Sequence, residues 1–160
     1  MTDIPKSLKH DLEPKYKIDY GSVLQNQHSV DGTRKMLIGV NNDPKAVYEA
    51  VFIPEDHRGT LCVSSQIGCS LSCRFCHTGT QKLYRNLTAA EIAGQYMITA
   101  SLLGDFPLSV NQQRKVSNIV FMGQGEPLYN FRNVSNAIQL LTDKAGIGLP
   151  SWRITVSTSG

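Results

Sequence analysis

An alternation of apolar strand patterns with helical patterns runs through most of this 160-residue chain. Residues 60–65, 117–122 and 153–157 are short apolar runs typical of buried strands, and 89–103 and 133–142 have helical spacing or composition. Strands that alternate with helices pair in parallel through right-handed crossovers. The pattern therefore predicts an α/β fold with about three βα units, which corresponds to part of a TIM-type barrel.

The first of the two helices has clear end signals. Thr88 precedes it and Glu91 follows three residues later, which is the spacing of a capping box. Gly104 comes directly after the last helical residue, where glycine commonly ends a helix. We therefore expect a helix over 89–103.

Two further apolar runs come before this alternation. Residues 35–40 and 46–53 are separated by the turn sequence of residues 41–44, which predicts a β-hairpin. Residues 1–30 are polar and show no strong period, so they predict a loose lead-in with room for one short helix.

The three predicted core strands all end in loops rich in Gly, Ser or Cys. In parallel α/β folds, functional sites gather at the C-terminal ends of the strands. We therefore expect the segments that follow residues 65, 122 and 157 to converge.

Cys69, Cys73 and Cys76 lie on the loop after the first core strand, in the spacing C-x3-C-x2-C. Structural zinc and iron–sulfur sites are normally closed by four protein ligands, whereas a site that binds substrate keeps one position open. Three thiolates on one short loop thus favour a [4Fe–4S] cluster whose fourth iron binds another molecule.

The chain has no signal-like apolar start and no segment near the roughly 20 apolar residues that span a bilayer. We expect a cytoplasmic protein without a membrane partner. In a reducing compartment, clustered cysteines are metal ligands rather than disulfide partners. The fourth cysteine, Cys62, stands apart from the cluster.

Two other metal sites fit parts of the same loop. The segment from Cys73 to His77 matches C-x-x-C-H, the attachment motif of c-type haem, but this leaves Cys69 without a function. A Cys3His zinc site would add His77 as fourth ligand, although the adjacent Cys76 and His77 would have difficulty reaching one ion. Three unligated thiols are a further alternative.

The loop and its neighbours resemble the RlmN/Cfr family of RNA adenine methyltransferases. The cysteine spacing, with Phe75 before the last cysteine, is similar to the signature of radical S-adenosylmethionine (SAM) enzymes. The other similar motifs are residues 62–69, 78–79, 85–92, 121–128 and 157–160. With the predicted hairpin, the resemblance covers most of residues 30–160.

The resemblance implies two cofactors, a [4Fe–4S] cluster and SAM. It implies that three thiolates bind the cluster: Cys69, Cys73 and Cys76. It implies that four residues contact SAM: Gly125, Glu126, Ser157 and Phe75. An electron from the cluster would cleave SAM to a 5′-deoxyadenosyl radical, with an electron donor such as flavodoxin.

The resemblance also implies the substrate, which is adenine C2 in 23S rRNA and, in one branch, tRNA; the other branch uses C8. Glu49 would help to remove the C2 proton, and Cys62 would release the protein–RNA adduct by forming a disulfide. Five cations are candidates for phosphate contacts in a chain of net charge +3: Arg34, Lys35, Arg74, Lys82 and Arg85.

Each of these residues also has a structural interpretation. Cys62 fits a buried strand cysteine, and Glu49 fits a solvent-facing strand residue. Phe75 fits a core aromatic, Glu126 a surface residue of a tight turn, and Ser157 a polar strand end.

The resemblance implies three parts: a lead-in over 1–30 left from an accessory region, a β-hairpin extension over 31–58, and the first half of a radical SAM domain over 59–160. The family's methyl-carrying cysteine lies in its C-terminal part, and this sequence has no cysteine after Cys76. We expect a truncated, monomeric chain that needs a C-terminal half to methylate RNA. A zinc-stabilised RNA-binding module and a non-functional gene fragment are the alternatives.

Overall fold

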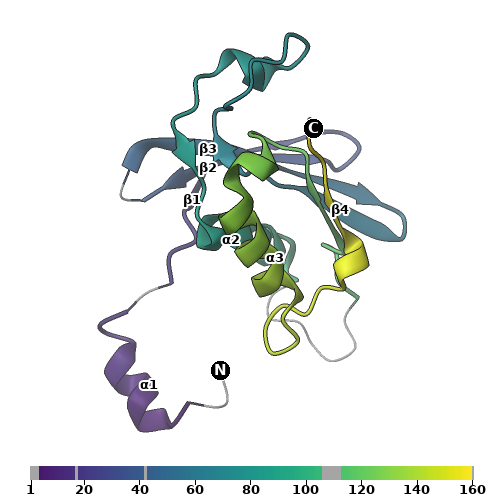
Figure 1. The fold of residues 1–160 in the computed structure, drawn as a ribbon. Helices are drawn as coiled ribbons and strands as arrows, with labels where there is room; N and C mark the ends of the chain where they lie inside the picture. Colours follow the sequence, from purple (N-terminus) through teal and green to yellow (C-terminus); the bar gives the residue numbers. More distant parts are fainter. Residues whose placement is uncertain (1–3, 17, 42, 106–112, 160) are drawn as a thin grey trace.

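The computed structural model describes residues 4–16, 18–41, 43–105 and 113–159. Six strands form one mixed sheet in the order β1-β2-β3-β4-β7-β8 (Figure 1). Their bounds are β1 (Ser22–His28), β2 (Arg34–Val40), β3 (Asp43–Glu55), β4 (Arg58–Cys62), β7 (Asn118–Phe121) and β8 (Ile154–Val156). The short strands β5 (Gln66–Ile67) and β6 (Arg85–Asn86) pair separately.

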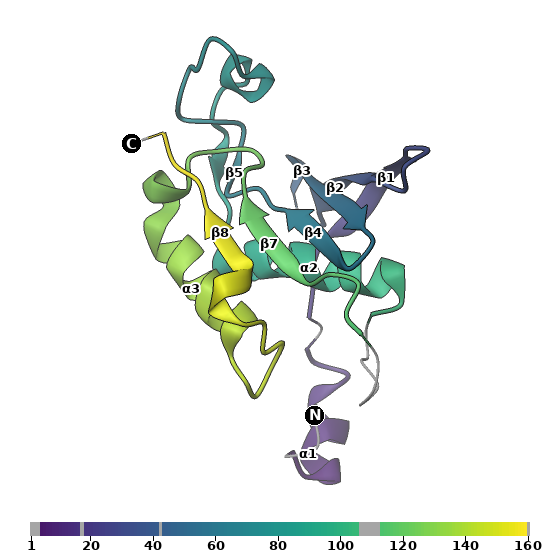
Figure 2. The ribbon, with the colours of Figure 1, turned by 90° about the vertical axis from the view of Figure 1, so that its right-hand side faces the viewer.

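The parallel part of the sheet follows the predicted alternation. The α-helices are α1 (Lys6–Leu12), α2 (Ala89–Leu103) and α3 (Phe131–Thr142). α2 leads to β7, α3 leads from β7 to β8, and β4, β7 and β8 pair in parallel (Figure 2). The α/β prediction is confirmed; the described strands form an open mixed sheet, so the partial barrel stays a prediction. No described helix is both long and apolar enough to cross a membrane.

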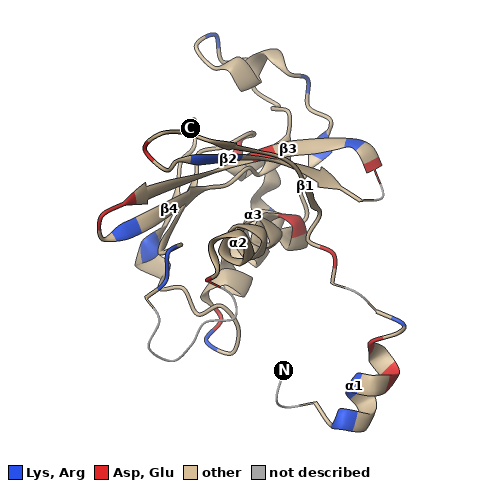
Figure 3. Ribbon diagram, turned by 180° about the vertical axis from the view of Figure 1, so that it is seen from behind, with Lys and Arg blue, Asp and Glu red and all other residues tan. Residues whose placement is uncertain are grey.

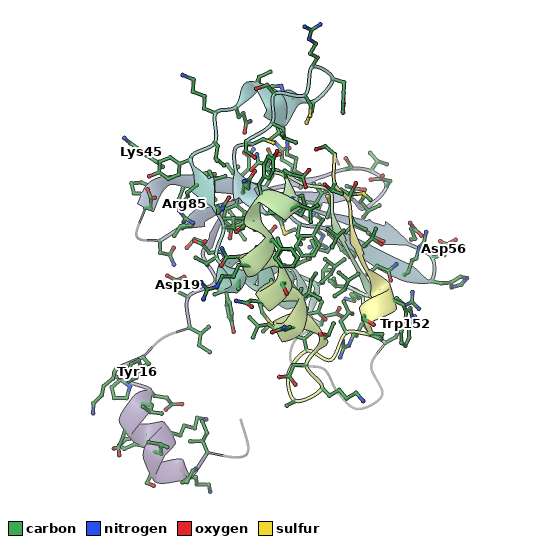
Figure 4. The ribbon with its side chains drawn as sticks, in the orientation of Figure 1. Tyr16, Asp19, Lys45, Asp56, Arg85 and Trp152 are labelled. Atoms are coloured by element: carbon green, nitrogen blue, oxygen red, sulfur yellow. The ribbon has the colours of Figure 1, made fainter. Side chains whose placement is uncertain are left out.

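The other half of the sheet is antiparallel. β2 and β3 form the predicted hairpin, although Asn42 of its turn lies outside the described residues. β4 returns along β3 after a tight turn; Lys45 and Asp56 lie at the opposite ends of β3 (Figure 4). The lead-in contains the expected short helix, but it also contains β1, which was not predicted. β1 is polar and mostly exposed and is joined to β2 by backbone pairing, so hydropathy does not reveal it.

The ends of α2 are those that the sequence predicts. The Thr88 hydroxyl accepts from the Glu91 N–H at 3.2 Å, and a Glu91 carboxylate oxygen accepts from the Thr88 N–H at 2.8 Å. Gly104 ends the helix with φ +72°, a conformation that glycine adopts without steric cost. Only Leu87 and Thr88 separate β6 from the start of α2.

The core lies between the sheet and the two long helices. Along β3, Tyr48 and Phe52 are buried on the helix-facing side, while Glu49 and Val51 are half-buried on the other face. α2 and α3 lie together on one side of the sheet (Figure 3). Glu49 therefore points to the opposite face of the sheet, away from the helices.

Candidate active site

The cysteine loop (residues 68–84) leaves the sheet just beyond the C-terminal end of β4. It projects past the other strands as the teal segment in Figures 1 and 2. The ribbon of β5 and β6 closes its base, and the Tyr84 N–H donates to the Ile67 carbonyl at 2.8 Å. The Tyr84 hydroxyl also donates to the Asp43 carboxylate at 3.0 Å, which ties the loop to the start of β3.

An ion pair fixes the base of the loop to α2. The Arg85 guanidinium donates to both carboxylate oxygens of Glu91, at 2.7 and 2.8 Å (Arg85 is labelled in Figure 4). Burial opposes ionisation of Glu91, but the bonds from Arg85 and Thr88 hold the pKa of this carboxyl below its usual value. Glu91 therefore both caps α2 and anchors the loop.

Two of the five cations suggested for RNA phosphates are already paired within the chain. Lys35 Nζ lies 2.8 Å from a Glu49 carboxylate oxygen, and Arg85 is held by Glu91. Lys and Arg are spread over the loop, the sheet and α1 rather than gathered in one band (Figure 3). The bidentate pairing argues against Arg85 as a phosphate contact; the others stay predictions.

The three loop cysteines are free thiols of intermediate exposure. The Cys76 N–H donates to the Cys73 carbonyl at 3.1 Å, and the Leu71 N–H points at the Cys69 sulfur at 3.4 Å. The backbone N–H of Gly79 lowers the pKa of the Cys76 thiol because it stabilises the thiolate. The loop therefore offers thiolate-type ligands to a metal.

Within the described residues, no group of three or more His, Cys, Asp or Glu side chains is placed to hold one metal ion. A Cys3His zinc site is thus not preformed in this part of the chain. A cluster makes a different demand, since each cysteine binds a separate iron and the sulfurs need not meet at one point. Three free thiols on one loop fit this donor set.

The ends of β4 and β7 meet below the loop, as the sequence predicts. The N–H groups of Ser65 and Gln66 donate to the Gln124 carbonyl at 2.8 and 3.1 Å, and the Gln124 N–H donates to the Ser64 hydroxyl at 2.9 Å. We call the buried polar residues here the polar platform: Ser64, Ser65, Gln66, Gln124, Glu126 and Asn130.

Glu126 belongs to this platform and is only 5% exposed, so the surface interpretation is wrong. One of its carboxylate oxygens accepts from the Leu128 N–H and the other from the Ser159 N–H, each at 3.0 Å. Burial opposes ionisation, but these bonds outweigh it and keep the pKa of Glu126 below its usual value. Glu126 therefore ties the loop after β7 to the segment after β8.

The other predicted SAM contacts differ in their placement. Gly125 is next to Glu126 and has φ +96°, which confirms the tight turn. Ser157 is exposed directly after β8, and Gly160 of the same motif lies outside the described residues. Phe75 is 95% exposed, so the core-aromatic interpretation is wrong and Phe75 is not packed against the turn.

Glu49 and Cys62 share the sheet face opposite the helices. Cys62 pairs with Val51, two residues from Glu49 along β3, so Cys62 and Glu49 are diagonal neighbours on this face. Burial raises the pKa of the Cys62 thiol, and the Met122 N–H partly offsets this effect. The two predicted catalytic residues therefore lie close together on one surface.

Several residues of the site were not predicted from the sequence. Gln95 is fully buried on α2 and bonds to both the N–H and the carbonyl of Ser64, each at 2.9 Å. Asn130 donates to the carbonyls of Ser65 and Leu87 at 2.8 and 2.7 Å. Hydropathy gives no signal for such residues, because polar side chains are expected at the surface.

A solved radical SAM methyltransferase from Sphaerobacter thermophilus has a similar fold. It superposes with a TM-score of 0.84 and 34% identity, over 99% of this chain and 45% of that chain. The fold and the three-cysteine loop thus define a chain of the radical SAM methyltransferase class. Curated relatives narrow this class further.

The "Dual-specificity RNA methyltransferase RlmN" of Rhizorhabdus wittichii is 52% identical over 160 residues, covering 100% of this chain and 39% of the relative. The proteins of the same name from Rhodopseudomonas palustris and Ruegeria sp. are 50% and 51% identical and are covered to 42% and 41%, each over 100% of this chain. The chain belongs to this RlmN family, and it spans about two fifths of the length of these relatives. A comparison with family models finds no match.

Proposed function

We propose that this chain provides the cluster loop and part of the SAM site of an enzyme that methylates adenine C2 in 23S rRNA and in tRNA. The observation that carries the proposal is the junction below the loop. There the base of the cysteine loop and the Gly125–Glu126 turn are bonded to the same strand ends, in a chain about half identical to RlmN proteins.

In this proposal, the thiolates of Cys69, Cys73 and Cys76 bind the cluster. When bound, the cluster and SAM supply radical chemistry, with an electron from a donor such as flavodoxin. The Glu126 carboxylate accepts from the backbone N–H groups of Leu128 and Ser159 and from the side chains of Thr158 and Ser159. In this proposal the ammonium group of SAM takes the place of the two hydroxyl donors, and the negative charge of Glu126 orients it.

Glu49 and Cys62 act on the RNA in this proposal. The raised pKa of Cys62 keeps it a thiol at neutral pH, and Glu49 lies on the same face. Glu49 accepts the proton from C2. The Cys62 sulfur then releases the RNA by forming a disulfide with the methyl-carrying cysteine, as the bond between that cysteine's sulfur and the adenine-bound carbon breaks and the Cys62 proton goes to this carbon.

We further propose that the methyl-carrying cysteine and the rest of a barrel wall come from sequence outside these residues. The 160 residues contain four cysteines, of which three are the proposed cluster ligands and the fourth is Cys62. This chain alone is expected to leave adenine unmethylated. Methylated adenine in RNA incubated with the chain alone, SAM and a reductant would contradict this part.

The proposal is tested by electron paramagnetic resonance of the anaerobically reconstituted, reduced chain during a SAM titration. SAM is expected to change the cluster spectrum, and Glu126→Gln is expected to weaken its binding at least tenfold because it removes the negative charge. Glu55→Gln is the matched control, since Glu55 is an exposed residue that pairs with Arg58. A spectrum that does not respond to SAM would refute the proposal.

A further inference from the structure

Gln66 on β5 hydrogen-bonds to two parts of the site, the cysteine loop and the turn that carries Glu126. Its side chain is 1% exposed. Its amide oxygen accepts from the Ser70 N–H at 3.3 Å, from the Ser70 hydroxyl at 3.2 Å and from the Glu126 N–H at 3.0 Å. A single oxygen therefore bonds the cysteine loop, one residue after Cys69, and the turn that carries Glu126.

The rest of the Gln66 side chain is fixed as well. Its amide nitrogen donates to the Asn86 side chain at 2.7 Å, across the ribbon that closes the loop. The turn packs on its stem, since a Cβ built on Gly125 would lie 2.5 Å from both Cβ and Cγ of Gln66. The missing side chain at Gly125 is thus what lets the turn approach Gln66.

Other bonds also join the loop and its base to the β7 side. The Gln66 N–H donates to the Gln124 carbonyl at 3.1 Å, the Gln124 side chain donates to Gln81 at 3.4 Å, and Asn86 donates to the Tyr129 carbonyl at 3.3 Å. These three bonds do not involve the cysteines' immediate neighbours or the backbone of Glu126. A buried amide oxygen with three donors also makes its bonds interdependent, because loss of the acceptor leaves a buried N–H unpaired.

We propose that Gln66 is a positioning residue that sets the placement of the cysteine loop relative to the Gly125–Glu126 turn. Its effect on SAM rests on the proposed function, whereas its effect on the loop does not. Without the Gln66 acceptor, the loop and the turn move independently, and a ligand that contacts both loses its preorganised site.

The first test is amide hydrogen exchange, measured by NMR on Gln66→Met and on the unaltered chain. Methionine keeps the volume but cannot accept the three bonds. Exchange at Ser70 and Glu126 is expected to rise together at least tenfold relative to the most protected core amides of the same variant. The Tyr84 amide, which bonds to Ile67, is expected to change less than threefold. Unchanged exchange at Ser70 and Glu126 would overturn the proposal.

Two variants separate positioning from general destabilisation. Gln95→Met removes an equally buried glutamine whose side chain bonds to the N–H and carbonyl of Ser64, and it is expected to leave the Ser70 and Glu126 ratios within threefold. Gln66→Glu keeps an acceptor oxygen and is expected to retain at least a third of the coupled protection. The proposal fails if Gln95→Met reproduces the effect, or if Gln66→Glu behaves like Gln66→Met.

The second test uses the anaerobically reconstituted chain. Gln66→Met is expected to keep its iron and sulfide content and to bind SAM at least tenfold more weakly, as read from the SAM-dependent change of the cluster spectrum. Unchanged SAM affinity with faster amide exchange would refute the claim that positioning by Gln66 strengthens SAM binding. If the unaltered chain ignores SAM, the proposed function fails while the exchange test of Gln66 still stands.

Discussion

The cysteine loop and the polar platform beneath it are neighbours with opposite character. Residues 69–84 of the loop are exposed or half-buried, and Phe75 is 95% exposed. The platform residues are at most 8% exposed, and their side chains bond across the ends of β4 and β7. The segment with the metal ligands therefore has little packing of its own.

This contrast indicates how the loop is placed. Loops without a packed core are ordered by the elements to which they are bonded. Here the bonds run through the ribbon of β5 and β6, the Arg85–Glu91 pair and Gln66. Changes in the platform should therefore reduce stability, whereas changes at the loop tip should affect ligand binding without reducing stability.

The largest effect is expected for Gly125→Ala. The position has φ +96°, and the new Cβ would also lie 2.8 Å from the backbone nitrogen of Gln66. Left-handed strain and overpacking each cost about 1–3 kcal/mol, so we expect a loss on the order of 3 kcal/mol in the free energy of unfolding, measured in urea.

Gly104→Ala is the matched control for this prediction. Gly104 has φ +72° but no atom within 4 Å of an added Cβ, so only the backbone cost of about 1 kcal/mol applies. Equal losses for the two variants would show that the close approach to Gln66 does not matter and would weaken the contrast between platform and surface.

A smaller loss is expected for Asn130→Leu. The substitution leaves the buried carbonyls of Ser65 and Leu87 without their donor, and an unsatisfied buried group costs about 1–3 kcal/mol. The measurement is again urea unfolding, with Asn136→Leu on the exposed side of α3 as control. A loss no larger than that of the control would show that the platform bonds contribute little.

Glu91→Gln tests the anchor of the loop through pH. At pH 7 we expect a loss of about 1–2 kcal/mol, because the charge-assisted bonds to Arg85 are weakened. The folded pKa of Glu91 is depressed, so its stabilisation is present above the unfolded pKa of about 4.3 and is lost as pH falls through the folded value.

The difference between Glu91→Gln and the unaltered chain should therefore shrink in urea unfolding at pH 3 compared with pH 7. Glu55→Gln, which breaks an exposed pair with Arg58, should change stability much less at either pH. A difference for Glu91→Gln that is the same at both pH values would contradict a charge-based anchor.

The smallest effect on stability is expected for Phe75→Ser. A side chain that is 95% exposed loses almost no packing, so the free energy of unfolding should change by less than about 0.5 kcal/mol. The SAM contact that the family resemblance implies for Phe75 nevertheless predicts weaker SAM binding in the reconstituted chain. A large loss of stability, or unchanged SAM binding, would argue against this separation.

Local sequence signals predicted the elements that have strong patterns. Thr88, Glu91 and Gly104 gave the bounds of α2, and the apolar runs gave β4, β7 and β8 in their parallel order. The convergence of the loops after β4 and β7 followed from that order alone. These features are local, or they follow from general connection rules.

The remaining features depend on contacts between distant residues. β1 is held by backbone pairing to β2, which leaves no apolar period in its own sequence. Gln66 and Asn130 are buried because partners more than 40 residues away satisfy their amides. Glu126 was predicted as a SAM contact by resemblance, but its bond to Ser159 could only be seen in the structure.

The central claim is that the loop of Cys69, Cys73 and Cys76 holds a [4Fe–4S] cluster. The most direct measurement is metal and sulfide analysis of the chain after anaerobic reconstitution, with each of the three cysteines also changed singly to alanine. We predict about four iron and four sulfide per chain, with a loss in each variant. Stoichiometric zinc without sulfide, or iron and sulfide content unaffected by all three substitutions, would contradict the claim.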